Sequence, residues 1–392
     1  MPGSITLMAR MPCSGVHGPV NSNTQTAEYS CPWRYVFHRC TSGMFHHDRE
    51  VLIMKNTIYI VTGAAGHLGS HIVSELVREG NTVRAFILPS EAGLIRTSSP
   101  NLTWITGDVC LPDTLEPLFL QEDSGPAEDL ILIHCAGLIS IYGGKTPGVY
   151  AVNVEGTKNV VDACIRHHIK RLVYVSSVHA IPEAPQHKVI SEIRTFSPGH
   201  VTGYYAKTKA EATQYVLDSA ARGLDAVVVH PSGIIGPAER PAGSLMHMIS
   251  NYTKKGMPVA VHGGYDFVDV RDVASGAIKA AQKGRSGECY ILSNRFISLK
   301  ELFTEMSKAA GQKKPRLFLP AWTAKCAAPF AQLHYKCWKK TPVFTPYAMY
   351  TLTSNGNFSH EKASRELGYH PRPLHQTIAD MIRQLREHSV KK

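Results

Sequence analysis

The chain has 392 residues, of which 43% are hydrophobic and 19% are charged, and its formal net charge is +11. This size allows a large core, and no apolar run approaches the roughly 20 residues of a membrane-spanning helix, so we expect no transmembrane segment. From residue 311 onward, 14 Lys and Arg stand against 4 Asp and Glu. Because these charges are dispersed rather than gathered in one basic block, we expect no nucleic-acid partner.

Residues 1–53 carry no periodic apolar pattern and are rich in Ser, Gly and Pro. They lack the apolar stretch of a secretory signal, and we expect a disordered N-terminal extension. Met54, followed by "KNTIYIVTG", is typical of a chain start. The nine cysteines include no C-x-x-C pair, so we expect free thiols, no bound metal and a reducing, cytoplasmic location.

From residue 57 the sequence alternates short apolar runs with longer helical patterns. Strands are predicted over residues 57–62, 82–88, 102–106, 130–134, 171–175 and 225–230, and helices over 68–79, 147–168 and 203–222. Several strands are continuous apolar runs, as expected where both faces of a sheet are covered. The alternation predicts an α/β fold, with a Rossmann-type doubly wound parallel sheet over residues 54–230.

The pattern changes after residue 230. Gly and Pro are frequent over 231–264, and a short strand is then predicted at 289–292, between a helix at 272–282 and helices at 298–310 and 359–388. We expect residues 231–392 to form mainly a smaller, mixed α/β domain that binds the substrate. One strand and one helix of this part are expected to return to the parallel sheet.

The first strand runs into three glycines, Gly63, Gly66 and Gly69, and then into a helix. Gly63 permits a sharp exit from the strand, Gly66 lets the backbone approach a pyrophosphate, and Gly69 lets helix and strand pack closely. The helix N-terminus presents free N–H groups to the phosphates. This context predicts a dinucleotide-binding turn.

The choice between NAD and NADP is normally made at the end of the second strand, where an acidic residue favours NAD and an Arg favours NADP. That position is near Leu88, which is neither. Arg84 and Glu91 lie nearby, but the sequence does not give their orientation. The cofactor is therefore expected to be NAD or NADP, with the preference open.

Tyr205 and Lys209, in "GYYAKTKAEA", are four residues apart on a predicted helix and project from one face. An ammonium beside a phenol is expected to lower the pKa of the Tyr toward neutrality, so that it can pass a proton to a carbonyl oxygen as hydride arrives. Ser177, at the end of a strand, can donate a hydrogen bond to the same oxygen. We predict that these three residues are catalytic; a second pair with the same spacing, Tyr335 and Lys339, lacks this context.

Together these motifs resemble the extended branch of the short-chain dehydrogenase/reductase superfamily, the NAD-dependent epimerase/dehydratase family, over residues 57 to about 388. The resemblance is carried by "TGAAGHLG", "GDV", "HCAG", "VNVEGTKNVVDAC", "HPSGIIGP", "FVDVRDVA" and "KASRELGYHPRPL". It implies a homodimer whose faces are helices 147–168 and 203–222. It also implies that the cofactor contacts Gly63, Ala65, Gly66, His67, Leu68, Gly69, Asp108, Val109, Cys135, Ala136, Gly137, Asn153, Tyr205, Lys209, Pro231, Gly233 and Ile234.

Within this branch the sequence favours carbonyl chemistry. Val178 and His179 stand where dehydratases carry an acidic pair, and "SGIIGP" replaces the Asn-rich loop of sugar-nucleotide epimerases. The segments resemble the dihydroflavonol reductase and 3β-hydroxysteroid dehydrogenase side, except that His230 replaces the usual Arg. We therefore expect an NAD(P)-dependent oxidoreductase that interconverts a ketone and a secondary alcohol on a small, fairly apolar substrate. A nucleotide-sugar epimerase and a non-catalytic NAD(P)-sensing protein are the alternatives.

Overall fold

A computed structural model describes residues 57–95, 97–120, 129–140, 144–238, 243–320, 322–323 and 346–390. The predicted N-terminal extension and the second Tyr-x-x-x-Lys pair lie outside these residues. All of the described residues fall within one unit of the chain.

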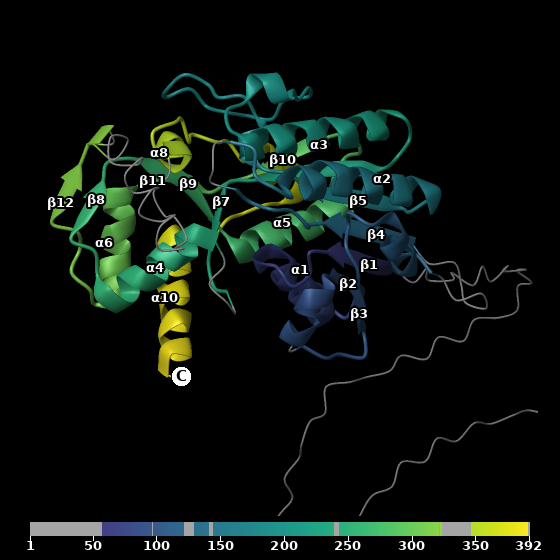
Figure 1. The fold of residues 1–392 in the computed structure, drawn as a ribbon, viewed down its shortest axis with the longest axis horizontal. Coiled ribbons are helices and arrows are strands. Elements are labelled where there is room, and N and C mark those ends of the chain that lie inside the picture. The colour runs from purple at the N-terminus through teal and green to yellow at the C-terminus, as the bar shows by residue number, and fades with distance from the viewer. Residues whose placement is uncertain are drawn as a thin grey trace, which may run out of the picture. The chain divides into compact units, whose positions relative to one another are not determined.

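A seven-stranded parallel sheet lies at the centre of this unit (Figure 1). In spatial order its strands are β10 (Cys289–Leu292), β6 (Ala226–Pro231), β5 (Arg171–Val175), β4 (Asp129–His134), β1 (Thr57–Thr62), β2 (Thr82–Ile87) and β3 (Leu102–Thr106). The prediction of a doubly wound parallel sheet is therefore confirmed. The strand order reverses between β1 and β4, and ligands of such sheets bind beyond the carboxyl ends of the strands at this switch point.

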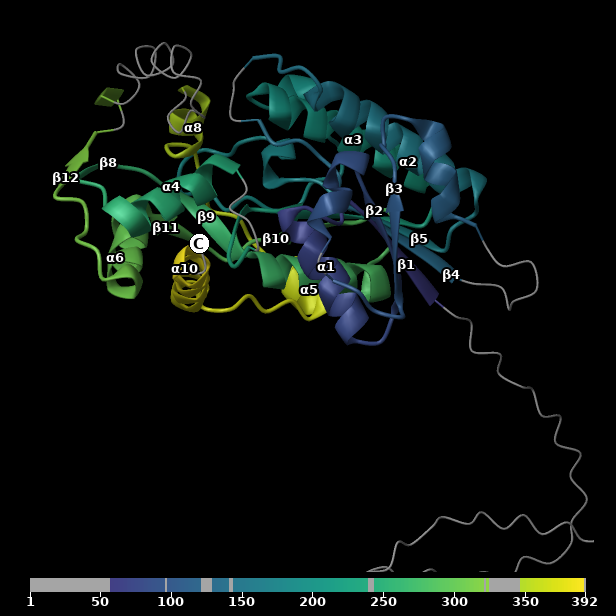
Figure 2. The ribbon, with the colours of Figure 1, turned by 60° about the horizontal axis from the view of Figure 1, so that its bottom comes forward.

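Helices cover both faces of the sheet (Figure 2). The helices α2 (Gly156–Arg166) and α3 (Tyr204–Ala221) pack on one face, and α1 (His67–Arg78) and α5 (Val270–Lys283) pack on the other. All six residues of β6 are buried because helices lie on both of its sides. The helix α1 buries four residues at spacings of three and four, which is the pattern of a helix with one face on a core.

The chain after β6 also builds two smaller sheets beside the large one (Figure 1). In the first, β9 (Gly264–Asp269) pairs with β7 (Gly233–Ile235) in parallel and with β11 (Arg295–Ser298) antiparallel. In the second, β8 (Val259–Val261) pairs with β12 (Leu317–Leu319). Their helices are α4 (Gly243–Lys255), α6 (Leu299–Ala310), α8 (Pro346–Thr351) and α10 (Leu374–Val390). The strand β10 and the helix α5 return to the large sheet.

Short helical turns connect the larger elements. They are η1 (Pro89–Leu94), η2 (Pro112–Leu118), η4 (Val178–Ala180) and η5 (Pro198–His200). The turn η3 (Ala151–Glu155) is a π-helical turn that runs directly into α2, so the helix predicted over 147–168 is present with a π turn in it. Single π turns occur often at functional sites.

The single helix predicted over residues 359–388 was wrong. The chain forms α9 (Glu361–Leu367) and then α10, with an irregular segment between them. Gly368 ends α9 with a φ of +67°, in the left-handed region that closes many helices. Pro371 and Pro373 follow before α10 begins, and neither can donate the backbone hydrogen bond that a continuous helix would need.

Within the described ranges, no helix combines the length and the apolar character needed to cross a bilayer. In the same part of the chain, no three His, Cys, Asp or Glu side chains are grouped so that they could hold a metal ion. The cysteines that the structure describes there, Cys110, Cys135, Cys164 and Cys289, are free thiols.

Candidate active site

The glycine-rich turn joins β1 to α1 at the carboxyl edge of the large sheet. Gly63 has a φ of +67°, and a Cβ atom there would lie 2.8 Å from the backbone nitrogen of Ala136. A Cβ atom on Gly69 would overlap the Gly63 carbonyl oxygen, which itself accepts the Gly66 amide at 2.9 Å. No side chain caps the N-terminus of α1 at Gly66. The residues present therefore fit a dinucleotide whose diphosphate rests on bare backbone amides.

His67, predicted to contact the cofactor, also links this turn to the segment after β7. The Nε2 atoms of His67 and His71 both donate to the carbonyl oxygen of Pro237, at 3.1 and 2.9 Å. Burial lowers the pKa of His67, which favours the neutral ring. The two imidazoles therefore hold the start of α1 against the end of the "HPSGIIGP" segment.

The segment after β4 is held by Asn153 from the π turn. The Asn153 amide accepts from the Leu138 backbone N–H at 2.8 Å and donates to the Leu138 carbonyl at 3.0 Å. A Cβ atom on Gly137 would lie 3.5 Å from the Nζ atom of Lys209. The structure thus brings Gly137, Asn153 and Lys209 together. Asn153 also donates to Thr208 of α3 at 3.2 Å.

A buried chain of hydrogen bonds behind this segment was not singled out in the sequence. The Nδ1 atom of His134 lies 2.7 Å from the Thr62 hydroxyl, and its Nε2 atom lies 3.1 Å from the Thr157 hydroxyl. Burial lowers the pKa of His134 to about 3, so the ring is neutral. Thr157 in turn donates to the Asn153 carbonyl at 2.7 Å. The only sequence signal for these hydrogen bonds was a His at the end of an apolar strand.

The remaining predicted cofactor contacts also lie at the carboxyl edge of the sheet. The Asp108 carboxylate accepts from the Cys110 amide at 2.9 Å, and the Val109 carbonyl accepts from Asn159 of α2 at 2.9 Å. Both residues directly follow β3. The others lie in the turn after β1, after β4, at the end of β6 and in β7: Ala65, Leu68, Cys135, Ala136, Pro231, Gly233 and Ile234.

The structure orients the two charged residues near the end of β2. The Glu91 carboxylate accepts from the Leu88 amide at 3.0 Å, which places a negative charge directly after this strand. Arg84 donates to the carbonyl of Leu118, in η2, at 2.9 Å. Of these two side chains, the acidic one lies after β2 and the basic one reaches from within β2 to η2.

Lys209 is buried beneath the end of β5. Its Nζ atom donates to the Val175 carbonyl at 2.9 Å and to the Tyr174 hydroxyl at 3.4 Å. The same atom lies 5.0 Å from the centre of the Tyr174 ring, within the range of a cation–π contact. Burial lowers the pKa of Lys209 to about 8, which still leaves the side chain mostly charged at neutral pH.

Tyr205 lies one helical turn before Lys209, and Ser177 reaches it from the end of β5. Burial raises the pKa of Tyr205 to about 12, although a hydrogen bond from Ser177 opposes the rise. The expectation that Lys209 lowers this pKa toward neutrality was therefore wrong. The physical reason is that the ammonium points to the Val175 carbonyl and the Tyr174 hydroxyl, so desolvation of the phenol dominates.

The two serines after β5 have different surroundings. The Ser176 hydroxyl lies 2.6 Å from the Thr213 hydroxyl of α3, inside the core. The Ser177 hydroxyl accepts from the His179 amide at 3.2 Å and lies close enough to Tyr205 to lower the pKa of that phenol. The structure therefore places Ser177 rather than Ser176 beside the predicted catalytic pair.

His230, which replaces the usual Arg of related sequences, supports Ser177 from β6. Its Nδ1 atom donates to the Ser177 carbonyl at 2.9 Å, and its ring stacks on Phe196 with the ring centres 5.2 Å apart. Burial lowers its pKa to about 4, so it is neutral. The neutral His230 ring therefore positions the Ser177 backbone and adds no positive charge near the substrate.

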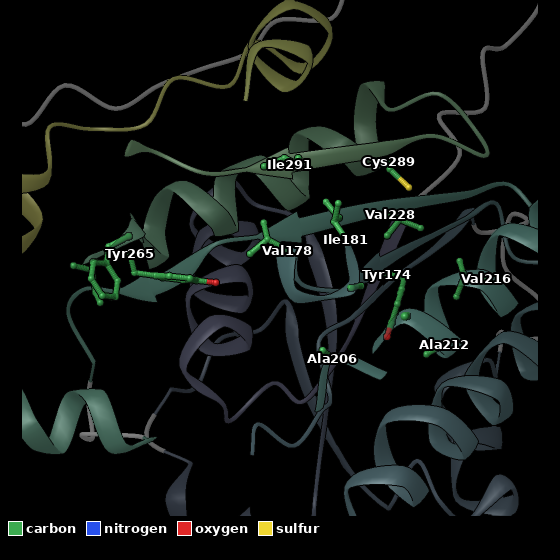
Figure 3. Packing of buried hydrophobic residues seen from close by; sticks show 14 of the residues in the cluster. Tyr174, Val178, Ile181, Ala206, Ala212, Val216, Val228, Tyr265, Cys289 and Ile291 are labelled. Carbon is green, nitrogen blue, oxygen red and sulfur yellow. The ribbon is translucent and has the colours of Figure 1, made fainter. Parts of the chain in front are cut away.

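A cavity of about 160 Å³ opens beside His179. Buried Val178, Ile181, Ile190 and Val201 give it an apolar part, and its lining also carries the polar residues Glu183, His200, Thr202, Ser354 and Asn355. His179 and Tyr265 line it as well. Figure 3 shows three of these within the buried cluster: Val178 from η4, Ile181 directly after it, and Tyr265 from β9.

His179 connects this cavity to Tyr205. The Nε2 atom of His179 and the Tyr265 hydroxyl are 3.0 Å apart and share a hydrogen bond, with their rings stacked at 5.7 Å. The His179 ring centre also lies 6.1 Å from that of Tyr205 and 6.3 Å from that of Tyr347. Burial lowers the pKa of His179 to about 4. Tyr265 and Tyr347 were missed in the sequence because no spacing relates them to Tyr205.

Comparison with known proteins agrees with the fold. The profile of the NAD dependent epimerase/dehydratase family matches residues 59–293, more than half of the chain. Sterol demethylase protein B from Methylococcus capsulatus is 28% identical over 335 residues, covering 84% of this chain and 99% of that protein. A 3-beta-hydroxysteroid dehydrogenase from Mycolicibacterium neoaurum is 26% identical over 330 residues, covering 80% and 86%. The crystal structure of gox2253 is 30% identical, with a TM-score of 0.70 over 84% of this chain and 98% of that one.

The parallel sheet, the glycine turn and the buried edge beside it define a nucleotide-dependent enzyme of the extended short-chain dehydrogenase/reductase type. The chain belongs to the NAD-dependent epimerase/dehydratase family. Its members use NAD chemistry on small-molecule substrates.

Proposed function

We propose that this protein is an NAD(P)-dependent oxidoreductase that interconverts a ketone and a secondary alcohol on a fairly apolar, polycyclic small molecule. The observation that carries the proposal is the arrangement of three side chains at the end of β5. The Ser177 side chain lies close enough to the Tyr205 phenol to lower its pKa, and the Lys209 ammonium is buried one helical turn further along α3. The glycine turn of β1 lies at the same edge of the sheet.

In the proposed reaction Tyr205 is the proton donor. Its raised pKa keeps the phenol protonated at neutral pH, so it can transfer its proton to the substrate oxygen during ketone reduction. Ser177 donates a hydrogen bond to the same oxygen. When bound, the nicotinamide cofactor supplies or accepts the hydride at the carbonyl carbon.

We propose that Lys209 hydrogen-bonds the nicotinamide ribose. Its ammonium points to the Val175 carbonyl and the Tyr174 hydroxyl rather than to the Tyr205 phenol. The pKa of Lys209 is lowered by burial to about 8, so the side chain is mostly charged at pH 7. A cation fixed by the Val175 carbonyl needs no rearrangement at the moment of reaction. We propose that Asn153, Gly137 and the glycine turn hold the cofactor and that residues 231–392 mainly bind the substrate.

The proposed substrate class follows from the cavity. The buried side chains of Val178, Ile181 and Ile190 offer apolar surface and no charge. Burial of an apolar ring system there is favourable, whereas a sugar ring would lose hydrogen bonds to water. The names of two relatives, which refer to sterols and 3β-hydroxysteroids, agree with an apolar substrate. Val178 stands where dehydratases carry an acidic residue and cannot transfer a proton, so dehydration is disfavoured.

The direct test is turnover by full-length protein with NAD or NADP against a panel of cyclic secondary alcohols and ketones, including steroids. Tyr205→Phe is expected to lower kcat by about 10²–10⁴-fold, because the proton donor is removed. The matched control is Tyr204→Phe, which removes a hydroxyl from the neighbouring residue of the same helix. It is expected to retain activity.

Two results would overturn the proposal. The first is unchanged turnover by Tyr205→Phe. The second is conversion of UDP- or dTDP-sugars without net change in the cofactor, which would assign the chain to the epimerases of the family. Cofactor binding without turnover of any ketone, alcohol or sugar nucleotide would instead identify a sensing protein.

A further inference from the structure

We infer that Tyr347 is a specificity-determining residue, whose hydroxyl binds a second oxygen atom of the substrate close to the reacting carbonyl. This inference rests on the proposed function. It deepens that function by naming the substrate class: an apolar cyclic ketone with a hydroxyl or carbonyl oxygen near the reacting carbon.

The first observation is that the Tyr347 hydroxyl is buried and has no partner within the described part of the chain. The residue is 8% exposed, and its oxygen has no hydrogen-bond partner among the residues that the structure describes. Burial raises the pKa of this phenol, so it is a neutral donor. A buried hydroxyl without a partner is unfavourable, and an incoming oxygen atom would remove that cost.

The second observation is the position of the Tyr347 ring at the start of α3. Gly203 has a φ of +98°, and a Cβ atom there would overlap the Tyr347 ring. The ring therefore lies directly on the backbone two residues before Tyr205. Only a residue without a side chain leaves room for it.

The third observation is that Tyr205 and Tyr347 border the same imidazole. Their ring centres lie 6.1 and 6.3 Å from that of His179. A substrate whose carbonyl oxygen meets Tyr205 thus places the neighbouring atoms of its ring system near Tyr347. The two phenols are suited to two oxygen atoms separated by a few bonds.

Neighbouring polar groups are already paired. The His179 Nε2 atom bonds the Tyr265 hydroxyl. Tyr350, three residues after Tyr347 on α8, forms side-chain hydrogen bonds with Glu183 and Thr202. Tyr347 is therefore the phenol of this group whose hydroxyl is left for a substrate.

The experiment compares Tyr347→Phe with the wild type on two substrates: a cyclic monoketone that the wild type reduces, such as 1-tetralone, and its α-hydroxy derivative. Removal of the donor is expected to lower kcat/KM about tenfold for the hydroxyketone, mainly through KM. The monoketone should change less than threefold. The melting temperature should hold or rise, because the variant removes an unpaired hydroxyl.

Tyr252→Phe is the control for loss of a buried phenol, since Tyr252 is fully buried in α4 and its hydroxyl lies 3.4 Å from the Lys313 carbonyl. It should leave both substrates unaffected. An equal loss on both substrates, a weakened affinity for NAD alone, or a lowered melting temperature would each overturn the inference. Failure of the proposed function would differ, because the wild type itself would then reduce neither ketone.

Discussion

The large sheet and the smaller region beside it contribute to the candidate site in different ways. Side chains from the large sheet are fixed by hydrogen bonds to backbone, as with Lys209 on Val175 and Asn153 on Leu138. The smaller region contributes Tyr265 and Tyr347, which meet the site through ring contacts with His179. Side chains that are hydrogen-bonded to backbone are held in one geometry. Side chains that only stack can be replaced by residues of other shapes without loss of a hydrogen bond. We propose from this difference that the large sheet fixes the reaction and that the smaller region selects the substrate.

Lys209→Met has the largest expected effect and tests whether residues of the large sheet fix the reaction. The variant keeps the length of the side chain but removes the charge, and we expect kcat for ketone reduction to fall about 10²–10³-fold. The control is Lys207→Met, because Lys207 is exposed two residues earlier on the same helix. A loss of less than tenfold for Lys209→Met would show that the large sheet does not fix the chemistry.

The glycine turn gives the second prediction. In Gly63→Ala, a residue with a side chain must adopt a φ of +67°, and its Cβ atom would lie 2.8 Å from the Ala136 backbone. We expect the variant to lose about 2–4 kcal/mol of unfolding free energy and to lose NAD binding. Gly80→Ala is the control, because Gly80 has a φ of +83° and no atom within 4 Å of a new Cβ. It should cost about 1–2 kcal/mol and leave NAD binding intact. Thermal unfolding with and without NAD separates the two effects, and equal NAD binding by both variants would contradict the prediction.

The pH dependence of ketone reduction gives the third prediction. The Lys209 pKa is lowered to about 8, so the ammonium is present below that pH and is lost above it, while Tyr205 stays protonated up to about pH 12. We expect kcat/KM to be constant between pH 6 and 7 and to fall by up to tenfold per pH unit above 8. A pH series with a saturating cofactor measures this. A rate that stays level to pH 10 would contradict it.

Tyr265→Phe gives the smallest expected effect and sharpens the comparison from the other region. Without the Tyr265 hydroxyl, His179 loses the partner of its Nε2 atom and its ring is less firmly held in the cavity wall. We expect KM to rise about fivefold, from a loss of about 1 kcal/mol, with kcat changed less than threefold. Tyr290→Phe is the control, since its hydroxyl bonds Glu366 on the opposite face of the sheet. A large loss in kcat would assign Tyr265 to the chemistry.

The large sheet and its edge could be predicted because their signals are local. Apolar runs locate the strands, and Gly63, Tyr205 and Ser177 each follow or begin an element whose end lies at one edge of a parallel sheet. The break between α9 and α10 was missed although Gly368, Pro371 and Pro373 were visible. There the apolar spacing on both sides was read as one helix.

The rest of the site depends on packing between distant segments. Tyr265 and Tyr347 are 86 and 168 residues from His179 along the chain, and no periodicity relates them to it. The direction of the Tyr205 pKa could not be predicted because it depends on where the Nζ atom of Lys209 points. Helical spacing gives the face of a side chain but not its hydrogen-bond acceptor.

The π turn η3 has a consequence for insertions and deletions in this chain. Such a turn holds one more residue than an α-helical turn, so removing one residue from 151–155 would make the helix regular. It would also rotate the preceding residues by about 100° about the helix axis relative to α2. Asn153 would then lose its register with Leu138. A shorter helix would form locally and still release the segment after β4 that Asn153 holds, which we propose to contact the dinucleotide.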